Sequence, residues 1–170
     1  MKITTGLKCK AKLSAAIWAL RNSPAGRKPR VFNRCAAESS LNLVTRTFTY
    51  MDGRTVVVKL QAPAMVNFME ALRDQDGRAI GNTASATSKY SGSFRTHAQQ
   101  AELRADYLNG TGHLAAGECS SWHEAGLALD LLLPTDGQRR CMKRHGFMDF
   151  LPNDPPHFSS HVNTATNGTF

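Results

Sequence analysis

The sequence predicts an α+β fold in which a small, largely antiparallel sheet is flanked by helices. Segments rich in Val, Thr, Leu and aromatic residues, typical of strands, occur at residues 45–50, 55–60 and 127–133. Segments with the apolar period of a helix lie between and after them, without the regular strand–helix alternation of a parallel sheet. The chain has 170 residues, 41% hydrophobic and 20% charged, which is the balance of one globular domain.

The first expected unit is a hairpin followed by a helix. Residues 45–50 and 55–60 flank Asp52-Gly53, and Asp-Gly is a strong signal for a hairpin turn. Pro63 then begins an amphipathic helix, since proline is favoured in the first turn. The apolar face of this helix consists of Met65, Phe68, Met69 and Leu72.

The second half of the chain carries shorter elements separated by turn residues. Residues 79–89 are small and polar and are expected to form a loop. The other expected elements are a short strand at residues 90–94, a helix capped by Thr96 that stops at Asn109-Gly110, a buried strand at residues 127–133, and a helix at residues 136–145 ended by Gly146.

The positive charge of the chain is confined to one end. Residues 1–37 contain nine basic and no acidic side chains, whereas residues 38–170 contain 12 basic and 13 acidic ones. We therefore divide the chain into a basic N-terminal helix and linker, residues 1–37, and a neutral domain, residues 38–170. The basic arm would be attracted to polyanions such as nucleic acid, an anionic membrane face or cell-envelope polymers. A solvated face that only aids solubility explains the charge equally well.

The basic arm, residues 1–37, lacks the sequence features of a signal peptide or a membrane anchor. Its helical period places Leu13, Ile17 and Leu20 on one side. The apolar stretch at residues 13–20 is short, is followed by Arg21 and has no convincing cleavage site. No apolar run reaches the ~18 residues that span a bilayer.

Asp130 is the residue that most needs an explanation. It lies within Gly126-Leu-Ala-Leu-Asp130-Leu-Leu-Leu133, a run that otherwise favours burial. An uncompensated buried carboxylate costs several kcal/mol, so Asp130 must be paired, hydrogen-bonded or bound to a metal.

Two histidines in motifs before and after Asp130 could bind a metal together with it. The chain reads Ser121-Trp-His123-Glu-Ala-Gly-Leu-Ala-Leu-Asp130, and later Asp154-Pro-Pro-His157. Two histidines and one aspartate supply the three nitrogen and oxygen ligands that Zn²⁺ takes at a catalytic site, with a fourth position left for water. Asp154 lies three residues before His157 and could contact that water without binding the metal.

These motifs resemble the zinc D-alanyl-D-alanine carboxypeptidases of the VanX/VanY type, a family that includes phage endolysins acting as L-alanyl-D-glutamate endopeptidases. The family pattern is Ser-x-His-x-x-Gly-x-Ala-x-Asp followed by Glu/Asp-x-x-His. A third segment, Ser93-Phe94-Arg95-Thr96-His-Ala-Gln-Gln100, is similar to the family's Gly-Tyr-Arg-Ser/Thr-x-x-x-Gln. All three occur in the family's order, over residues 61–158. The resemblance implies the fold that these peptidases share with the Hedgehog signalling domain.

The resemblance assigns a role to each site residue. His123, Asp130 and His157 would bind one Zn²⁺ per chain, and Asp154 would be the general base. Arg95 would bind the substrate's carbonyl or carboxylate, and Ser121 would support the substrate-binding site by hydrogen bonding. An amide bond of the peptidoglycan stem peptide would then be hydrolysed by zinc-bound water. Three positions depart from the pattern, where Ser93, Phe94 and Pro156 replace the usual Gly, Tyr and Trp.

Within the family, the sequence favours an endolysin over a carboxypeptidase. The carboxypeptidases resemble Glu-x-x-His, whereas the endopeptidases resemble the Asp-x-x-His found at Asp154 and His157. We therefore expect a monomeric hydrolase for bacteriophage cell lysis that binds peptidoglycan and no nucleic acid. It would be made in the host cytoplasm and act on the cell wall in the periplasm. A D-Ala-D-Ala carboxypeptidase is the alternative.

Two further interpretations remain open. Cys119-x-x-x-His123 and Cys141-x-x-x-His145 could together form a structural Cys₂His₂ zinc site, which would make the chain a non-catalytic zinc-binding module. That interpretation leaves Asp130, Asp154 and His157 unexplained. The other possibility is a catalytically silent relative that binds cell-wall peptides. The presence of all three predicted ligands together with Asp154 argues against it. We expect His97, His113 and His161 at the surface or behind the site.

Overall fold

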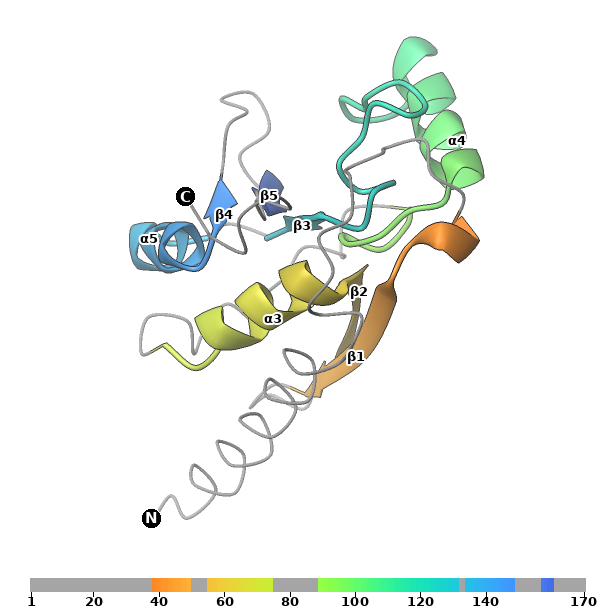
Figure 1. Ribbon diagram of the computed structural model, residues 1–170. Coiled ribbons are helices and arrows are strands. Elements are labelled where there is room, and N and C mark those ends of the chain that lie inside the picture. Colours follow the sequence, from red (N-terminus) through yellow and green to blue (C-terminus); the bar gives the residue numbers. More distant parts are fainter. Residues whose placement is uncertain (1–37, 50–54, 75–88, 132–133, 149–156, 161–170) are drawn as a thin grey trace.

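The computed structural model describes residues 38–49, 55–74, 89–131, 134–148 and 157–160. Helices and small antiparallel sheets are mixed along the chain, so the expected α+β class is confirmed (Figure 1). None of the described helices is long and apolar enough to cross a membrane. The basic segment 1–37 and most of the loop expected at residues 79–89 lie outside the described residues.

The expected hairpin is present. A short 3-10 helix, η1 (Glu38–Ser40), leads into β1 (Leu43–Thr49), which pairs antiparallel with β2 (Thr55–Gln61). Leu43 lies opposite Gln61 in this ladder. The Asp-Gly turn itself falls outside the described residues.

Helix α3 (Ala62–Ala71) follows β2 directly and carries the centre of the core. Met65, Phe68 and Met69 are buried, as the helical period predicts. The Phe68 ring packs edge-on against Phe48 of β1, with centroids 5.5 Å apart, and against Phe147, 6.4 Å away. The core therefore lies between the hairpin, α3 and the second sheet (Figure 1).

The second sheet positions the site. Its strands are β3 (Ala128–Asp130), β4 (Phe147–Met148) and β5 (His157–Ser160), arranged antiparallel in the order β3-β5-β4. All four residues of β5 are buried. The register places Asp130 directly opposite His157.

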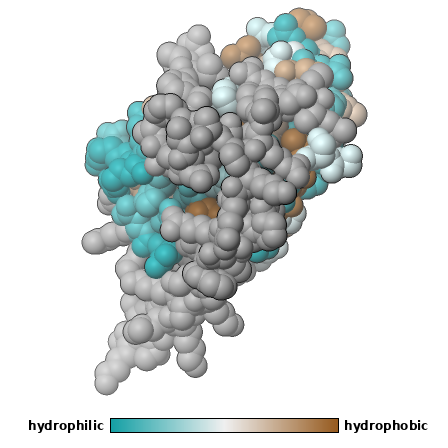
Figure 2. Space-filling view, in the orientation of Figure 1, coloured by the Kyte–Doolittle hydropathy of each residue, from teal (hydrophilic) through white to brown (hydrophobic). Residues whose placement is uncertain are grey.

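The two remaining helices begin where the sequence predicts. Thr96 caps α4 (His97–Leu108), and Thr135 caps α5 (Asp136–Arg144), each through a capping box. Helix α5 packs against α3, whereas α4 is largely exposed and buries only Gln100. Figure 2 shows hydrophilic residues gathered on the side of α5 and apolar residues near the end of α4, where Leu108 and Leu114 are exposed.

The strand expected at residues 90–94 is wrong. Single main-chain bonds join this segment to the neighbouring strands: Phe94 N donates to Lys59 O of β2 (3.0 Å), and Asp130 N of β3 donates to Gly92 O (2.7 Å). One bond on each side is not a ladder, so no strand forms. The segment instead links the two sheets, and it brings Ser93 beside His123 and Arg95 beside Asp130.

Gly126 generates a first prediction. Its φ is +67°, and a Cβ placed on it would lie 2.6 Å from Leu43 Cδ2 and 3.3 Å from Gln61 N. We expect Gly126→Ala to lower the free energy of unfolding by at least about 1–2 kcal/mol, because the left-handed backbone alone has that cost for a residue with a side chain.

Gly117→Ala is the matched control for denaturant unfolding, since a Cβ at Gly117 would meet nothing within 4 Å. We expect it to stay within about 0.5 kcal/mol of the unsubstituted protein. Equal stability of the two variants would contradict the role given to Gly126.

Candidate metal centre

Three side chains predicted as metal ligands come together at one point. His123 comes from a turn before β3, Asp130 is the last residue of β3, and His157 is the first of β5. His123 Nε2 lies 3.2 Å from His157 Nδ1 and 3.2 Å from Asp130 Oδ1. His157 Nδ1 lies 3.4 Å from the same Oδ1. The structure thus forms a nearly equilateral triangle of two nitrogens and one oxygen.

A main-chain carbonyl orients His123. Its Nδ1 lies 2.7 Å from Ser93 O, and a carbonyl oxygen can only accept a hydrogen bond. Nδ1 therefore carries the hydrogen, and Nε2 keeps its lone pair on the side of Asp130 and His157, where Arg95 Nη2 also lies 3.4 Å away. Burial of the ring lowers the pKa of His123 against the opposing pull of Asp130. The imidazole is consequently neutral near pH 7, which is the form that binds metals.

A serine on the same strand orients His157. Its Nε2 lies 2.7 Å from Ser159 Oγ, two residues further along β5. When Nε2 donates this bond, Nδ1 is left with its lone pair facing Asp130 and His123. Both histidines are thus fixed by their outer nitrogen, as is usual for histidine ligands of metals.

The two carboxylate oxygens of Asp130 face different partners. Oδ1 faces the two histidines, whereas Oδ2 accepts a hydrogen bond of 2.8 Å from Arg95 Nη2. Burial alone would raise the pKa of Asp130, but its polar neighbours, among them the guanidinium group of Arg95, outweigh burial and hold that pKa well below its usual range. Asp130 is therefore ionised, and its cost of burial is offset by these neighbours.

Arg95 lies at the edge of the triangle. Its Nη1 donates to Gln100 Oε1 at 3.3 Å, and its main-chain N donates to His123 O at 3.3 Å. Only 9% of the residue is exposed. The structure places Arg95 beside the ligands as expected, and a role in binding substrate stays a prediction.

Ser121 and Glu124 hold the turn that carries His123. Ser121 Oγ accepts the main-chain N–H of His123 at 3.2 Å. Glu124 is 1% exposed, and its carboxylate accepts from the N–H groups of Cys119 (3.0 Å) and Ser121 (3.1 Å) and lies 2.6 Å from His97 Nδ1. Ser121 therefore acts through the position of His123, and its predicted contribution to substrate binding remains untested.

Some supporting residues were not found from the sequence. Ser159 could have been found, because it lies two residues after His157 and residues two apart on a strand share a face. Ser93 contributes a main-chain carbonyl, which no sequence pattern marks. The sequence offered Glu124 as a second candidate for the base, whereas its structural role has no sequence signal because its partners are main-chain groups and a distant histidine. Asp154, the predicted base, and Pro156 lie outside the described residues.

The rival Cys₂His₂ site does not form among the described residues. They contain three groups of potential ligands, and none joins both cysteine–histidine pairs. Cys119 is disulfide-bonded and so offers no thiolate. The three groups are His123, Asp130 and His157; Asp74, Cys141 and His145; and His97, Cys119 and Glu124, of which the disulfide-bonded Cys119 cannot serve as a ligand.

Comparisons of the chain with protein-family models, with curated proteins and with solved structures found no match. The functional argument therefore rests on the residues and their geometry.

Glu124 generates a second prediction. A glutamine side chain at this position would direct an N–H₂ group at one of the donors that the carboxylate now satisfies. We expect Glu124→Gln to lower the free energy of unfolding by about 1–3 kcal/mol, the cost of unsatisfied buried polar groups. Glu118→Gln, at an exposed neighbouring position, is the control for the same thermal and denaturant measurements. Equal effects of both substitutions would show that the buried network does not stabilise the turn.

Proposed function

We propose that this protein is a zinc-dependent peptidoglycan peptidase that hydrolyses an amide bond of the stem peptide, with L-alanyl-D-glutamate the preferred bond. The resemblance of its motifs to the VanX/VanY-type peptidases and their phage endolysins supports this function and the fold shared with the Hedgehog domain. The observation that carries the proposal is the triangle of His123 Nε2, Asp130 Oδ1 and His157 Nδ1, with sides of 3.2, 3.2 and 3.4 Å.

The triangle fits zinc. Zinc bonds of about 2.0–2.2 Å to nitrogen and oxygen in tetrahedral geometry separate neighbouring ligand atoms by about 3.3–3.6 Å. The observed separations come within about 0.1 Å of that range, and both histidines are held in the orientation a ligand needs. Three protein ligands without sulfur are typical of a catalytic centre, whereas structural zinc sites usually have four.

The surrounding residues suit amide hydrolysis. Zinc bound here would act as a Lewis acid and lower the pKa of water toward about 7. Arg95 places a guanidinium group next to Asp130 Oδ2, where it can bind a substrate carbonyl or carboxylate oxygen. Asp154, three residues before His157 in the sequence, is the proposed proton acceptor from the attacking water and donor to the leaving amine.

The bond that is cut can be determined directly. Purified sacculi incubated with the zinc-loaded protein should yield peptides with a new amino-terminal D-glutamate, identified by mass spectrometry. Release of terminal D-alanine would instead assign the carboxypeptidase activity. No cleavage of either bond at full zinc occupancy would refute the proposed function.

The ligand assignment gives a third prediction. The double variant His123→Ala, His157→Ala should lose zinc from this centre together with all activity on sacculi, because two of the three ligands are gone. His113→Ala, at an exposed histidine, is the control and should keep both. Zinc analysis after dialysis measures the outcome. Undiminished zinc at this centre in the double variant would rule out the assignment.

Asp154 gives a fourth prediction. Asp154→Asn should bind zinc as the unsubstituted protein does but lose about 10²–10⁴-fold in turnover, since the amide cannot accept a proton from water. Turnover within a few-fold of the unsubstituted protein, at equal metal content, would place the base elsewhere.

A further inference from the structure

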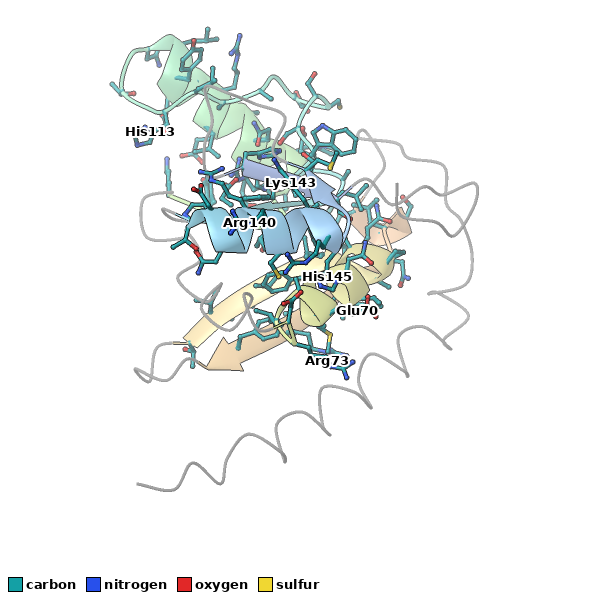
Figure 3. The ribbon with its side chains drawn as sticks, turned by 90° about the vertical axis from the view of Figure 1, so that its left-hand side faces the viewer. Glu70, Arg73, His113, Arg140, Lys143 and His145 are labelled. Carbon is teal, nitrogen blue, oxygen red and sulfur yellow. The ribbon has the colours of Figure 1, made fainter. Side chains whose placement is uncertain are left out.

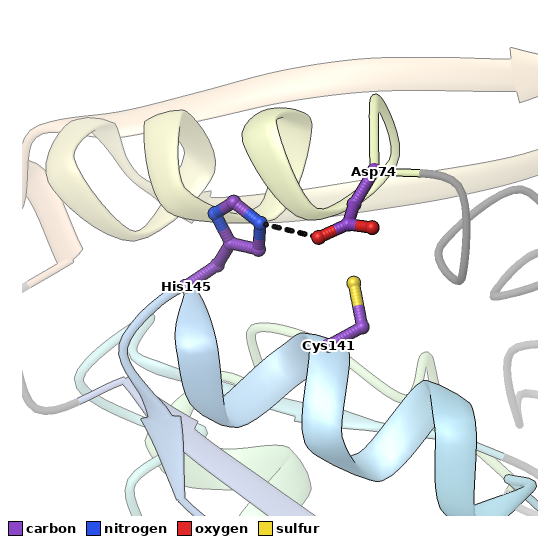
Figure 4. A group of neighbouring side chains, drawn as sticks. All are labelled: Asp74, Cys141 and His145. Carbon is purple, nitrogen blue, oxygen red and sulfur yellow. Dashed lines mark hydrogen bonds and ion pairs between the residues drawn. The ribbon is translucent and has the colours of Figure 1, made fainter.

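A second group of metal-binding side chains lies away from the triangle. Asp74 follows α3, Cys141 lies in the last turn of α5, and His145 is the residue that caps that helix (Figure 4). One ligand atom from each lies within 4.8 Å of the others. His145 Nε2 and Asp74 Oδ2 are already 3.3 Å apart, a separation suited to two ligands of one tetrahedral zinc ion.

We propose that Asp74, Cys141 and His145 form a second, structural zinc site that ties the end of α3 to the end of α5. The site would be independent of the peptidase centre and of its activity. A thiolate, an imidazole and a carboxylate are all ligands that zinc accepts, and a fourth position is left for water or another side chain.

The burial of these groups suits an ion that enters from the surface. Cys141 is fully buried, whereas the side chains of Asp74 and His145 are each 23% exposed. Figure 3 shows His145 on the side of α5 that faces α3. The thiol thus forms the floor of the site, and the two other ligands form its accessible rim.

The helix ends favour a cation at this place. Helices α3 and α5 both have their C-terminal ends here, and the unpaired carbonyl groups of a helix C-terminus carry a partial negative charge. The positive charge of Arg144 partly offsets this negative potential, since its Nη2 donates to Asp74 Oδ2 at 2.9 Å. A carboxylate has room for about four contacts, so Arg144 and an ion can share Asp74.

The thiol can be deprotonated without leaving a carbonyl unsatisfied. Cys141 Sγ donates to Ala71 O at 3.5 Å, and the same oxygen also accepts the main-chain N–H of Asp74 at 3.1 Å. Zinc would replace the thiol proton, which would leave to solvent, while Ala71 O would keep its main-chain bond.

Cobalt tests this proposal because it reports sulfur ligands by a thiolate-to-metal charge-transfer absorption. The peptidase centre has no sulfur ligand, so the band identifies the second site. The full chain titrated with Co²⁺ should bind two ions and show the band. The His123→Ala, His157→Ala variant should keep the band with one ion bound. Cys141→Ser should bind one ion without the band and retain activity on sacculi.

Substitutions of the two partly exposed ligands test the site even if Cys141→Ser fails to fold. His145→Gln and Asp74→Asn should each weaken cobalt binding at this site at least about tenfold, since even the loss of a residue that only orients a ligand costs about 10–100-fold in metal affinity. His113→Gln is the control that leaves binding unchanged. Absence of the band in the unsubstituted protein, or its persistence in Cys141→Ser, would overturn the second site. Either result would leave the peptidase proposal intact, because that centre is measured separately by sacculus cleavage and by the ion that the His123→Ala, His157→Ala variant loses.

Discussion

The ionised carboxylate of Asp130 is the constraint on which the site depends. It ends β3 within an apolar run, and the ladder places it opposite His157 in the fully buried strand β5. A carboxylate there is tolerated only if its charge is compensated. Arg95 compensates the charge at one oxygen, and the two histidines present nitrogen lone pairs beside the other, where a bound zinc ion would complete the compensation.

The elements around Asp130 serve to keep its partners in place. The irregular segment before α4 hydrogen-bonds to both sheets and thereby supplies Arg95 and the carbonyl of Ser93. The buried carboxylate of Glu124 and the hydroxyl of Ser121 organise the turn that presents His123. The ligands are thus held by short strands and by hydrogen bonds between side chains and main chain. The apolar core around Phe68 extends to Leu129 and Phe158, which neighbour Asp130 and His157 on these strands.

The sequence could predict what local patterns encode. The Asp-Gly turn predicted the hairpin. The apolar period after Pro63, the cap at Thr96 and the turn at Gly146 marked three helices, and one charged residue in an apolar strand indicated the site. The 90–94 strand was wrong because its composition suits a strand, while its neighbours leave it one bond on each side. The carbonyl of Ser93 and the approach of Asp74 to Cys141 depend on tertiary packing between distant segments, which residue spacing does not reveal. The Hedgehog-like fold and the peptidase activity remain proposals.

The most direct test of the central claim is X-ray absorption spectroscopy at the zinc edge on the full chain carrying Cys141→Ser, which leaves only the peptidase centre. The account predicts a single four-coordinate zinc with nitrogen and oxygen neighbours at about 2.0–2.1 Å, including the multiple-scattering signal of two imidazoles and no sulfur. A zinc with sulfur neighbours, or with one imidazole or none, would contradict the assignment of His123, Asp130 and His157 as its ligands.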